Sequence, residues 1–203
     1  MAVSAVCVFT ASSLNWDRGR PAQREQGLDT ANLKTTKLAS LNSLTANEAQ
    51  SELLKCCGSK EWAERMSAER SFASPEDLTV KADRVWWSLE PGDWLEAFLS
   101  HPKIGEKKAA AAVSDESKRW SEAEQAGVSG AATETMQALA QLNQKYEDKF
   151  GYIFIVCASG KTSDEMLAIL RERLENDPDE ELRIAAAEQA KITKLRLQKL
   201  VGV

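Results

Sequence analysis

The chain has 203 residues, which suits one domain with residues left over for a tail. Hydrophobic residues make up 43% and charged residues 28%, a balance that lets a globular domain bury its core without disulfides or metals. The formal net charge of −5 argues against nucleic acid as a partner, because phosphate binding needs a positive face. No apolar run is long enough to span a membrane.

The first 36 residues differ in composition from the rest. Residues 1–16 contain no acidic side chain, and Arg18, Arg20 and Arg24 follow them. An organelle transit peptide has this character, and so has a disordered tail. We therefore expect a flexible tail or targeting segment over 1–36 and a helical domain over 37–203. The last four residues, LVGV, are not a peroxisomal tripeptide.

Helix signals dominate from residue 38 to residue 100. Apolar residues recur there with helical spacing, and caps, glycines and prolines separate one run from the next. The side chains that mark these starts and stops are Thr45 with Glu48 (a capping box), Gly58, Ser59, Ser74 with Pro75, Gly92 and Pro102. The stretch predicts a series of helices, the last of them over 94–100.

The helical pattern continues to the C-terminus after a predicted loop or frayed turn over 103–114. Further helices are predicted near 118–125, over 131–150, from Thr162 or Ser163 to 174, and over 178–200. Only residues 152–157 have β-like character, and one such run does not make a sheet. The sequence therefore predicts an all-α fold, a single-domain bundle of roughly eight to nine helices.

His101 is the only histidine of the chain, and a proline follows it. A side chain that titrates near neutral pH is the usual proton-transfer group of an enzyme, so an enzyme that uses histidine here has one candidate. A single histidine after a helix is more often a capping or core-edge residue. Three further features favour a functional site instead.

The first feature is a polar helical face, since Ser121, Glu124 and Gln125 are related by i+3 and i+4 spacing. The second is Arg196, on the flank of the apolar side of the last predicted helix. It either snorkels to the surface or pairs with an anion in a pocket. The third is the apolar run 154–160, whose small final residues can bring backbone N–H groups to a ligand, or which is a buried connector.

Several short segments, taken in order, match a known family. They are CCGS at 56–59, RSF at 70–72, DWLEAF at 93–98, HPKIG at 101–105, SEAEQAG at 121–127, KFG at 149–151, FIVCASG at 154–160 and EQAKI at 188–192. Through these segments, taken together and in this order, the chain resembles the OHCU decarboxylase family, which acts on 2-oxo-4-hydroxy-4-carboxy-5-ureidoimidazoline (OHCU). The resemblance runs from about residue 38 to about residue 200.

The resemblance implies an activity and a site. The family decarboxylates OHCU to (S)-allantoin in urate degradation, and its catalytic histidine and partner glutamate fall on His101 and Glu124. His101 would donate a proton, and Glu124 would favour its imidazolium form. The implied substrate contacts are Pro102, Ser121, Glu122, Ala123, Glu124, Gln125, Val156, Cys157, Ala158, Ser159, Gly160 and Arg196.

The same resemblance implies no cofactor, because a ring C=N of OHCU can accept the electron pair that CO2 leaves behind. The sequence has no P-loop or G-x-G-x-x-G motif, and Cys7, Cys56, Cys57 and Cys157 indicate reduced thiols rather than a zinc set. Members of the family often form homodimers, so a homodimer is implied. Their pathway is often peroxisomal, which leaves the cytoplasm, the peroxisome or an organelle reached through residues 1–36 as compartments.

Two other functions fit parts of the sequence. One is a catalytically inactive helical scaffold or interaction module of the same fold. The other is a nucleic-acid-binding domain that uses the basic side chains of the last helix, and the net charge disfavours it. The basic side chains in question are Lys191, Lys194, Arg196 and Lys199.

Overall fold

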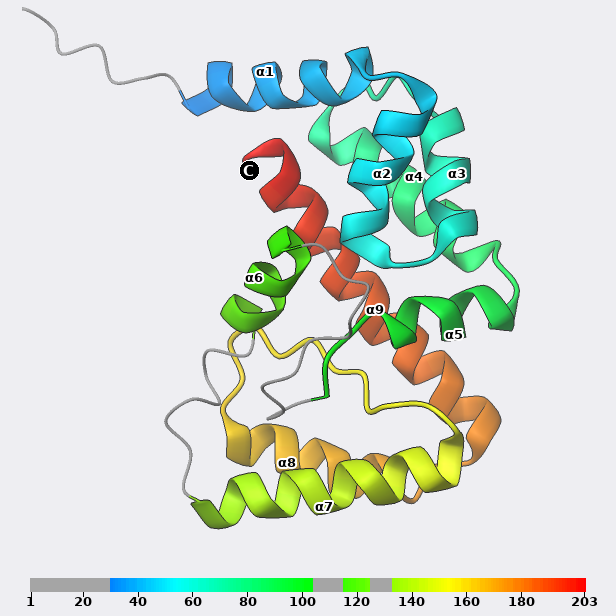
Figure 1. The fold of residues 1–203 in the computed structure, drawn as a ribbon, viewed down its shortest axis with the longest axis vertical. Coiled ribbons are helices and arrows are strands. Elements are labelled where there is room, and N and C mark those ends of the chain that lie inside the picture. The colour runs from blue at the N-terminus through cyan, green and yellow to red at the C-terminus, as the bar shows by residue number, and fades with distance from the viewer. Residues whose placement is uncertain (1–29, 104–114, 125–132) are drawn as a thin grey trace, which may run out of the picture.

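A computed structural model describes residues 30–103, 115–124 and 133–203, and these residues form nine helices and no strand (Figure 1). The helices are α1 (Thr30–Ser43), α2 (Ala46–Cys57), α3 (Lys60–Ala68), α4 (Pro75–Trp87), α5 (Pro91–Leu99), α6 (Asp115–Glu124), α7 (Thr133–Phe150), α8 (Ser163–Arg173) and α9 (Pro178–Val201). The prediction of an all-α fold with eight to nine helices is confirmed.

The predicted helix starts depend on local side-chain caps, and the structure contains them. Thr45 and Glu48 form the capping box of α2, and Ser59 and Ser74 accept hydrogen bonds from backbone N–H groups at the starts of α3 and α4. Of the two candidate caps of α8, Thr162 is the one that the structure uses. These caps satisfy N–H groups that the first turn of a helix leaves without a partner.

Some boundaries differ from the predicted ones. Helix α5 begins at Pro91 and not at residue 94, because a proline in the first turn needs no N–H partner and Glu90 and Asp93 form a capping box there. Helix α1 begins at Thr30, before the predicted domain start at residue 37. Residues 1–29 lie outside the described residues, so the tail or targeting segment stays a prediction.

Helix α9 is the longest helix of the described residues, with 24 residues, and it crosses the centre of the fold (Figure 1). It contacts α1, α2, α4 and α5, while α7 and α8 pack against each other. Trp86 on α4 is buried and donates a hydrogen bond from its indole nitrogen to the Ala186 oxygen on α9, at 2.9 Å. Its neighbour Trp87 is exposed, as the helical spacing requires.

The β-like run at 152–157 lies in the connection between α7 and α8 and forms no strand. Its residues are mostly buried, so the apolar pattern reports burial and not pairing with another strand. Gly151, at φ 80°, ends α7 and its N–H bonds the Glu147 oxygen. Among the described residues, no helix combines the length and apolar character that crossing a membrane requires.

Candidate active site

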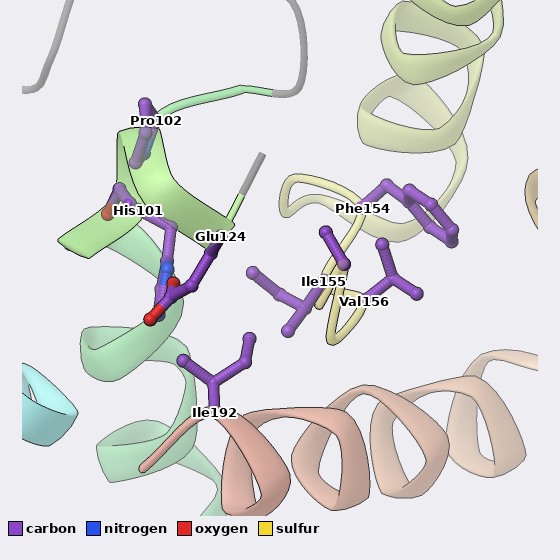
Figure 2. A pocket seen from close by; sticks show the side chains of 9 residues that line it. His101, Pro102, Glu124, Phe154, Ile155, Val156 and Ile192 are labelled. Carbon is purple, nitrogen blue, oxygen red and sulfur yellow. The ribbon is translucent and has the colours of Figure 1, made fainter. Parts of the chain in front are cut away.

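A pocket lies where the ends of α5 and α6 meet α9 and the α7–α8 connection, and the space without protein atoms there is about 380 Å³, open solvent included (Figure 2). His101 and Pro102 follow α5, Ser121 and Glu124 come from α6, and Ile192 comes from α9. The connection contributes Phe154, Ile155, Val156 and Ala158. The pocket thus sets one imidazole and one carboxylate among apolar side chains, an arrangement typical of small-molecule sites.

His101 follows directly on the capped end of α5, where its N–H bonds the Phe98 oxygen at 3.2 Å. Its ring is turned into the pocket, and its Nε2 atom is buried and has no hydrogen-bond partner in the part of the chain that the structure describes. Burial, and after it the positive charge of Arg196, lowers the pKa of His101 from 6.5 to about 3. The imidazole is therefore neutral at pH 7.

The carboxylate of Glu124 bonds to Arg196. Arg196 Nε lies 3.0 Å from Glu124 Oε1, and Arg196 Nη2 lies 2.9 Å from Glu124 Oε2, a bidentate pair. Lys199 approaches the same carboxylate at 3.6 Å. Glu124 is thus paired with Arg196, while burial and Arg196 lower the pKa of His101, and the role of Glu124 in favouring the imidazolium stays a prediction.

Arg196 is 2% exposed, so the snorkelling interpretation of this residue is wrong. Its Nη2 also donates to Ser121 Oγ at 3.0 Å, which joins α9 to both polar residues of the α6 face. The arginine pairs with a protein carboxylate in the pocket wall and holds Ser121 and Glu124 in fixed positions. Because Ser121 and Glu124 share this partner, the prediction that they lie on one face of their helix is confirmed.

Three contacts hold the connection that forms the opposite wall of the pocket. Arg173 Nη1 donates to the Ile155 oxygen at 2.7 Å, and the Cys157 N–H donates to Glu188 Oε2 at 2.7 Å. Lys161 Nζ donates to the Cys157 oxygen at 2.8 Å. These contacts use backbone groups of Ile155 and Cys157, while Val156, between them, lines the pocket.

A buried charged cluster supports this wall from behind. Arg173 and Glu181 are 5% and 0% exposed and form an ion pair, and Arg173 Nε bonds Glu181 Oε1 at 2.7 Å. The Tyr146 hydroxyl donates to the same carboxylate, and Asn176 donates to its other oxygen at 2.7 Å. Burial raises the pKa of Tyr146 well above its usual range, so the phenol stays protonated.

The structure brings together only part of the predicted site. His101, Pro102, Ser121, Glu124, Val156 and Ala158 line the pocket, and Arg196 lies directly behind it. Glu122, Ala123, Ser159 and Gly160 are exposed and are not among the lining residues. Cys157 is buried, its N–H is bonded to Glu188, and burial raises the pKa of its thiol. Gln125 lies outside the described residues.

Other residues at the site were not among the predicted substrate contacts. Phe154 and Ile155 line the pocket and belong to the run 154–160 that the sequence analysis singled out, and Ile192 also lines it. Arg173, Glu188 and Gln189 contact its wall residues from α8 and α9. Ile192 carried the ordinary signal of a core position, so nothing distinguished it. Among the described residues, no group of three or more histidine, cysteine, aspartate and glutamate side chains is arranged to hold a metal ion.

Comparison with known proteins gives one consistent family. The model of the OHCU decarboxylase family matches residues 42–198. The uric acid degradation bifunctional protein TTL of Arabidopsis thaliana is 44% identical over 146 residues, which cover 71% of this chain and 45% of that protein. The 2-oxo-4-hydroxy-4-carboxy-5-ureidoimidazoline decarboxylase of Amia calva is 32% identical over 133 residues, 65% of this chain and 75% of that one.

Solved structures agree with the sequence comparison. A crystal structure of OHCU decarboxylase in the presence of (S)-allantoin has 40% sequence identity and a TM-score of 0.65, and the match covers 75% of this chain and 98% of that one. The chain spans less than half of the bifunctional relatives that it matches, 45% of the Arabidopsis protein and 32% of one from Bacillus. The family model nevertheless covers most of the chain, and the chain belongs to the OHCU decarboxylase family.

Proposed function

We propose that this chain catalyses the cofactor-free decarboxylation of OHCU to (S)-allantoin, with His101 as the proton-transfer group. The observation that carries the proposal is the His101 imidazole, turned into a pocket whose wall holds the Arg196–Glu124 pair. Membership in the OHCU decarboxylase family supports the identity of the substrate.

The reaction needs an electron sink and a controlled proton. When the bond to the carboxylate breaks, its electron pair moves into the adjoining ring C=N and CO2 leaves. One proton is taken up per turnover, and a hydrogen must reach the ring carbon from one side to give a single enantiomer. A fixed imidazole in a pocket can deliver a hydrogen to one face only.

Without substrate, His101 is neutral, because burial and Arg196 disfavour the imidazolium. This state fits the task if the ring gains its proton after the substrate binds. The carboxylate of OHCU adds a negative charge near the ring, and an opposite charge raises the pKa of a histidine. We therefore expect His101 to gain a proton only in the substrate complex.

The remaining wall residues would bind the polar edges of the ligand. Ser121 and Glu124, held by Arg196, offer a hydroxyl and a carboxylate to the ring amides and the ureido arm. Val156 and Ala158 line the same pocket from the connection. The resemblance also assigns contacts to Gln125, Cys157, Ser159 and Gly160, and these assignments stay proposals.

The test is stereospecific. Urate oxidase and hydroxyisourate hydrolase generate the unstable substrate in the cuvette, this chain is added, and circular dichroism follows the product. We expect fast formation of (S)-allantoin at a rate proportional to the concentration of the chain. Formation of racemic allantoin at the uncatalysed rate would favour the inactive helical scaffold instead.

Assembly and compartment are proposed on the family likeness alone. We expect a homodimer, which sedimentation of the purified chain measures, and a monomer at micromolar concentration would contradict it. The cytoplasm and the peroxisome are the proposed compartments, and imaging of the tagged chain beside a peroxisomal marker distinguishes them. Localisation to a different organelle would favour a targeting role for residues 1–36.

A further inference from the structure

Gln189 is a fully buried amide on α9, one turn before the pocket residue Ile192. Its Nε2 atom donates to Thr193 Oγ1 at 3.1 Å and lies 3.4 Å from the Cys57 oxygen. Both partners accept hydrogen bonds, so they fix which end of the amide is the nitrogen. The Oε1 atom at the other end is buried, and residues 30–103, 115–124 and 133–203 give it no hydrogen-bond partner.

The Nε2 atom of His101 is in the same situation. It is buried and has no hydrogen-bond partner among the described residues. Gln189 acts on His101 as a hydrogen-bond partner does and raises its pKa, although burial and Arg196 lower that pKa by more. The two side chains are therefore neighbours. A buried polar atom without a partner is unfavourable, and here a ring nitrogen and an amide oxygen in that condition are neighbours.

Only one protonation state of the neutral ring gives both buried atoms a hydrogen-bond partner. A neutral imidazole carries its proton on either Nδ1 or Nε2. With the proton on Nδ1, the lone pair of Nε2 would meet the lone pairs of Gln189 Oε1. With the proton on Nε2, a donor meets an acceptor, and both buried atoms gain a partner.

We propose that Gln189 is a positioning residue that holds His101 in its Nε2–H tautomer, so that the lone pair of Nδ1 faces the pocket. The catalytic meaning of this tautomer rests on the proposed function. The charged groups that face His101 are Arg196 from α9 and, within the pocket, Glu124 from α6, and each neutralises the other.

This tautomer determines what His101 can do first. A lone pair accepts a proton before it can donate one, so the ring begins the reaction as a base. In OHCU the hydroxyl beside the departing carboxylate can supply that proton: its O–H bond breaks as the Nδ1–H bond forms, and CO2 leaves. The ring nitrogen of the substrate takes a proton from solvent, and Nδ1–H then breaks as the new C–H bond forms.

The single histidine makes the tautomer directly measurable. In the full chain labelled with ¹⁵N at histidine, only His101 gives imidazole nitrogen signals. We expect a pyrrole-type Nε2 and a pyridine-type Nδ1 at pH 7 without substrate. A pyridine-type Nε2, or two nitrogens of the imidazolium type, would overturn the proposal.

Two variants separate positioning from packing. Gln189→Met keeps the length of the side chain and removes the acceptor, so we expect the two tautomers to mix and kcat to fall about 10- to 10⁴-fold with a smaller change in KM. Gln189→Glu keeps an acceptor and adds a charge, so the Nε2–H tautomer should persist while the pKa of His101 rises by about 1–3 units. An unshifted pKa in Gln189→Glu contradicts the contact.

Asn143→Leu is the matched control. Asn143 is a buried amide on α7 that bonds the Leu139 oxygen, and it is not among the residues that line the pocket. Its loss should leave the nitrogen signals of His101 unchanged, and a change as large as in Gln189→Met would overturn the proposal. Because the spectra need no turnover, an inactive chain with the Nε2–H tautomer refutes the proposed function alone, whereas an active chain with the Nδ1–H tautomer refutes this inference alone.

Discussion

At the scale of single residues, the charge on Arg196 acts in two directions. It pairs with Glu124 through two hydrogen bonds, and it is the second cause, after burial, of the lowered pKa of His101. The arginine therefore fixes the carboxylate and at the same time keeps the imidazole neutral. One side chain thus links the position of Glu124 to the protonation of His101.

Replacing Arg196 by glutamine should raise the pKa of His101. The variant removes a nearby positive charge and leaves the Glu124 carboxylate facing the pocket without its bidentate partner, and both changes favour the imidazolium. Titration of the single histidine by NMR measures the shift. The double variant Arg196→Gln/Glu124→Gln should show a smaller rise, and a fall in the pKa of the single variant would contradict the argument.

Acid should destabilise the fold through His101. Its pKa is about 3 in the folded chain and near 6.5 in the unfolded chain, so the unfolded chain binds one more proton between these values. The free energy of unfolding should then decrease as the pH falls below 6.5, by up to about 1.4 kcal/mol per pH unit.

Urea unfolding at pH 7, 6 and 5 measures this dependence in the wild type and in His101→Asn. Carboxylates titrate mainly below this range, so the histidine dominates the change. The variant should lose most of the slope between pH 6.5 and 5. Equal slopes in the two proteins would show that His101 is not buried in its neutral form.

At the scale of elements, the α7–α8 connection depends on side chains from α8 and α9 for its shape. Arg173 holds the Ile155 oxygen and Glu188 holds the Cys157 N–H, because the connection has no neighbouring strand to bond these groups. Helix α6 is fixed in a similar way by Ser117, whose hydroxyl donates to the Lys55 oxygen on α2 at 3.1 Å. Side chains of other elements therefore hold both walls of the pocket, and α9 contributes to each of them, through Arg196 and through Glu188.

Removing the carboxylate of Glu188 should weaken substrate binding. In Glu188→Ala the Cys157 N–H loses its acceptor, and a hydrogen bond to a charged group contributes about 1.5–3 kcal/mol. We expect kcat/KM to fall roughly 10- to 150-fold, mainly through KM. Glu188→Gln keeps an acceptor oxygen and should recover most of the loss, and equal losses in the two variants would show that the contact does not position the connection.

At the scale of the whole molecule, α9 carries both the packing of the fold and the support of the site. The helix contacts α1, α2, α4 and α5. It also brings Gln189, Ile192 and Arg196 to the pocket. Arg196 is buried and so does not contribute to the basic face on which the nucleic-acid alternative depends, and the charge of the exposed Lys191 is paired with Glu188.

The parts that the sequence could predict are those with local causes. Thr45, Ser59 and Thr162 cap helices through partners three residues away, so their signals lie within one turn. The partner of Arg196 lies 72 positions away, and its choice depends on how α6 and α9 pack. Helical periodicity placed Arg196 on a flank but could not select between solvent and Glu124. Gln189 lies in the family-matching segment 188–192, but nothing there indicated that it would adjoin His101.

The rate of (S)-allantoin formation by His101→Asn, compared with the wild type, tests whether His101 is the proton-transfer group. Urea unfolding and far-ultraviolet circular dichroism first establish that the variant is folded. We expect kcat to fall by at least about 100-fold, because the proposed mechanism assigns the proton transfer to the substrate carbon to His101. A folded variant that still forms (S)-allantoin at close to the wild-type rate would contradict it.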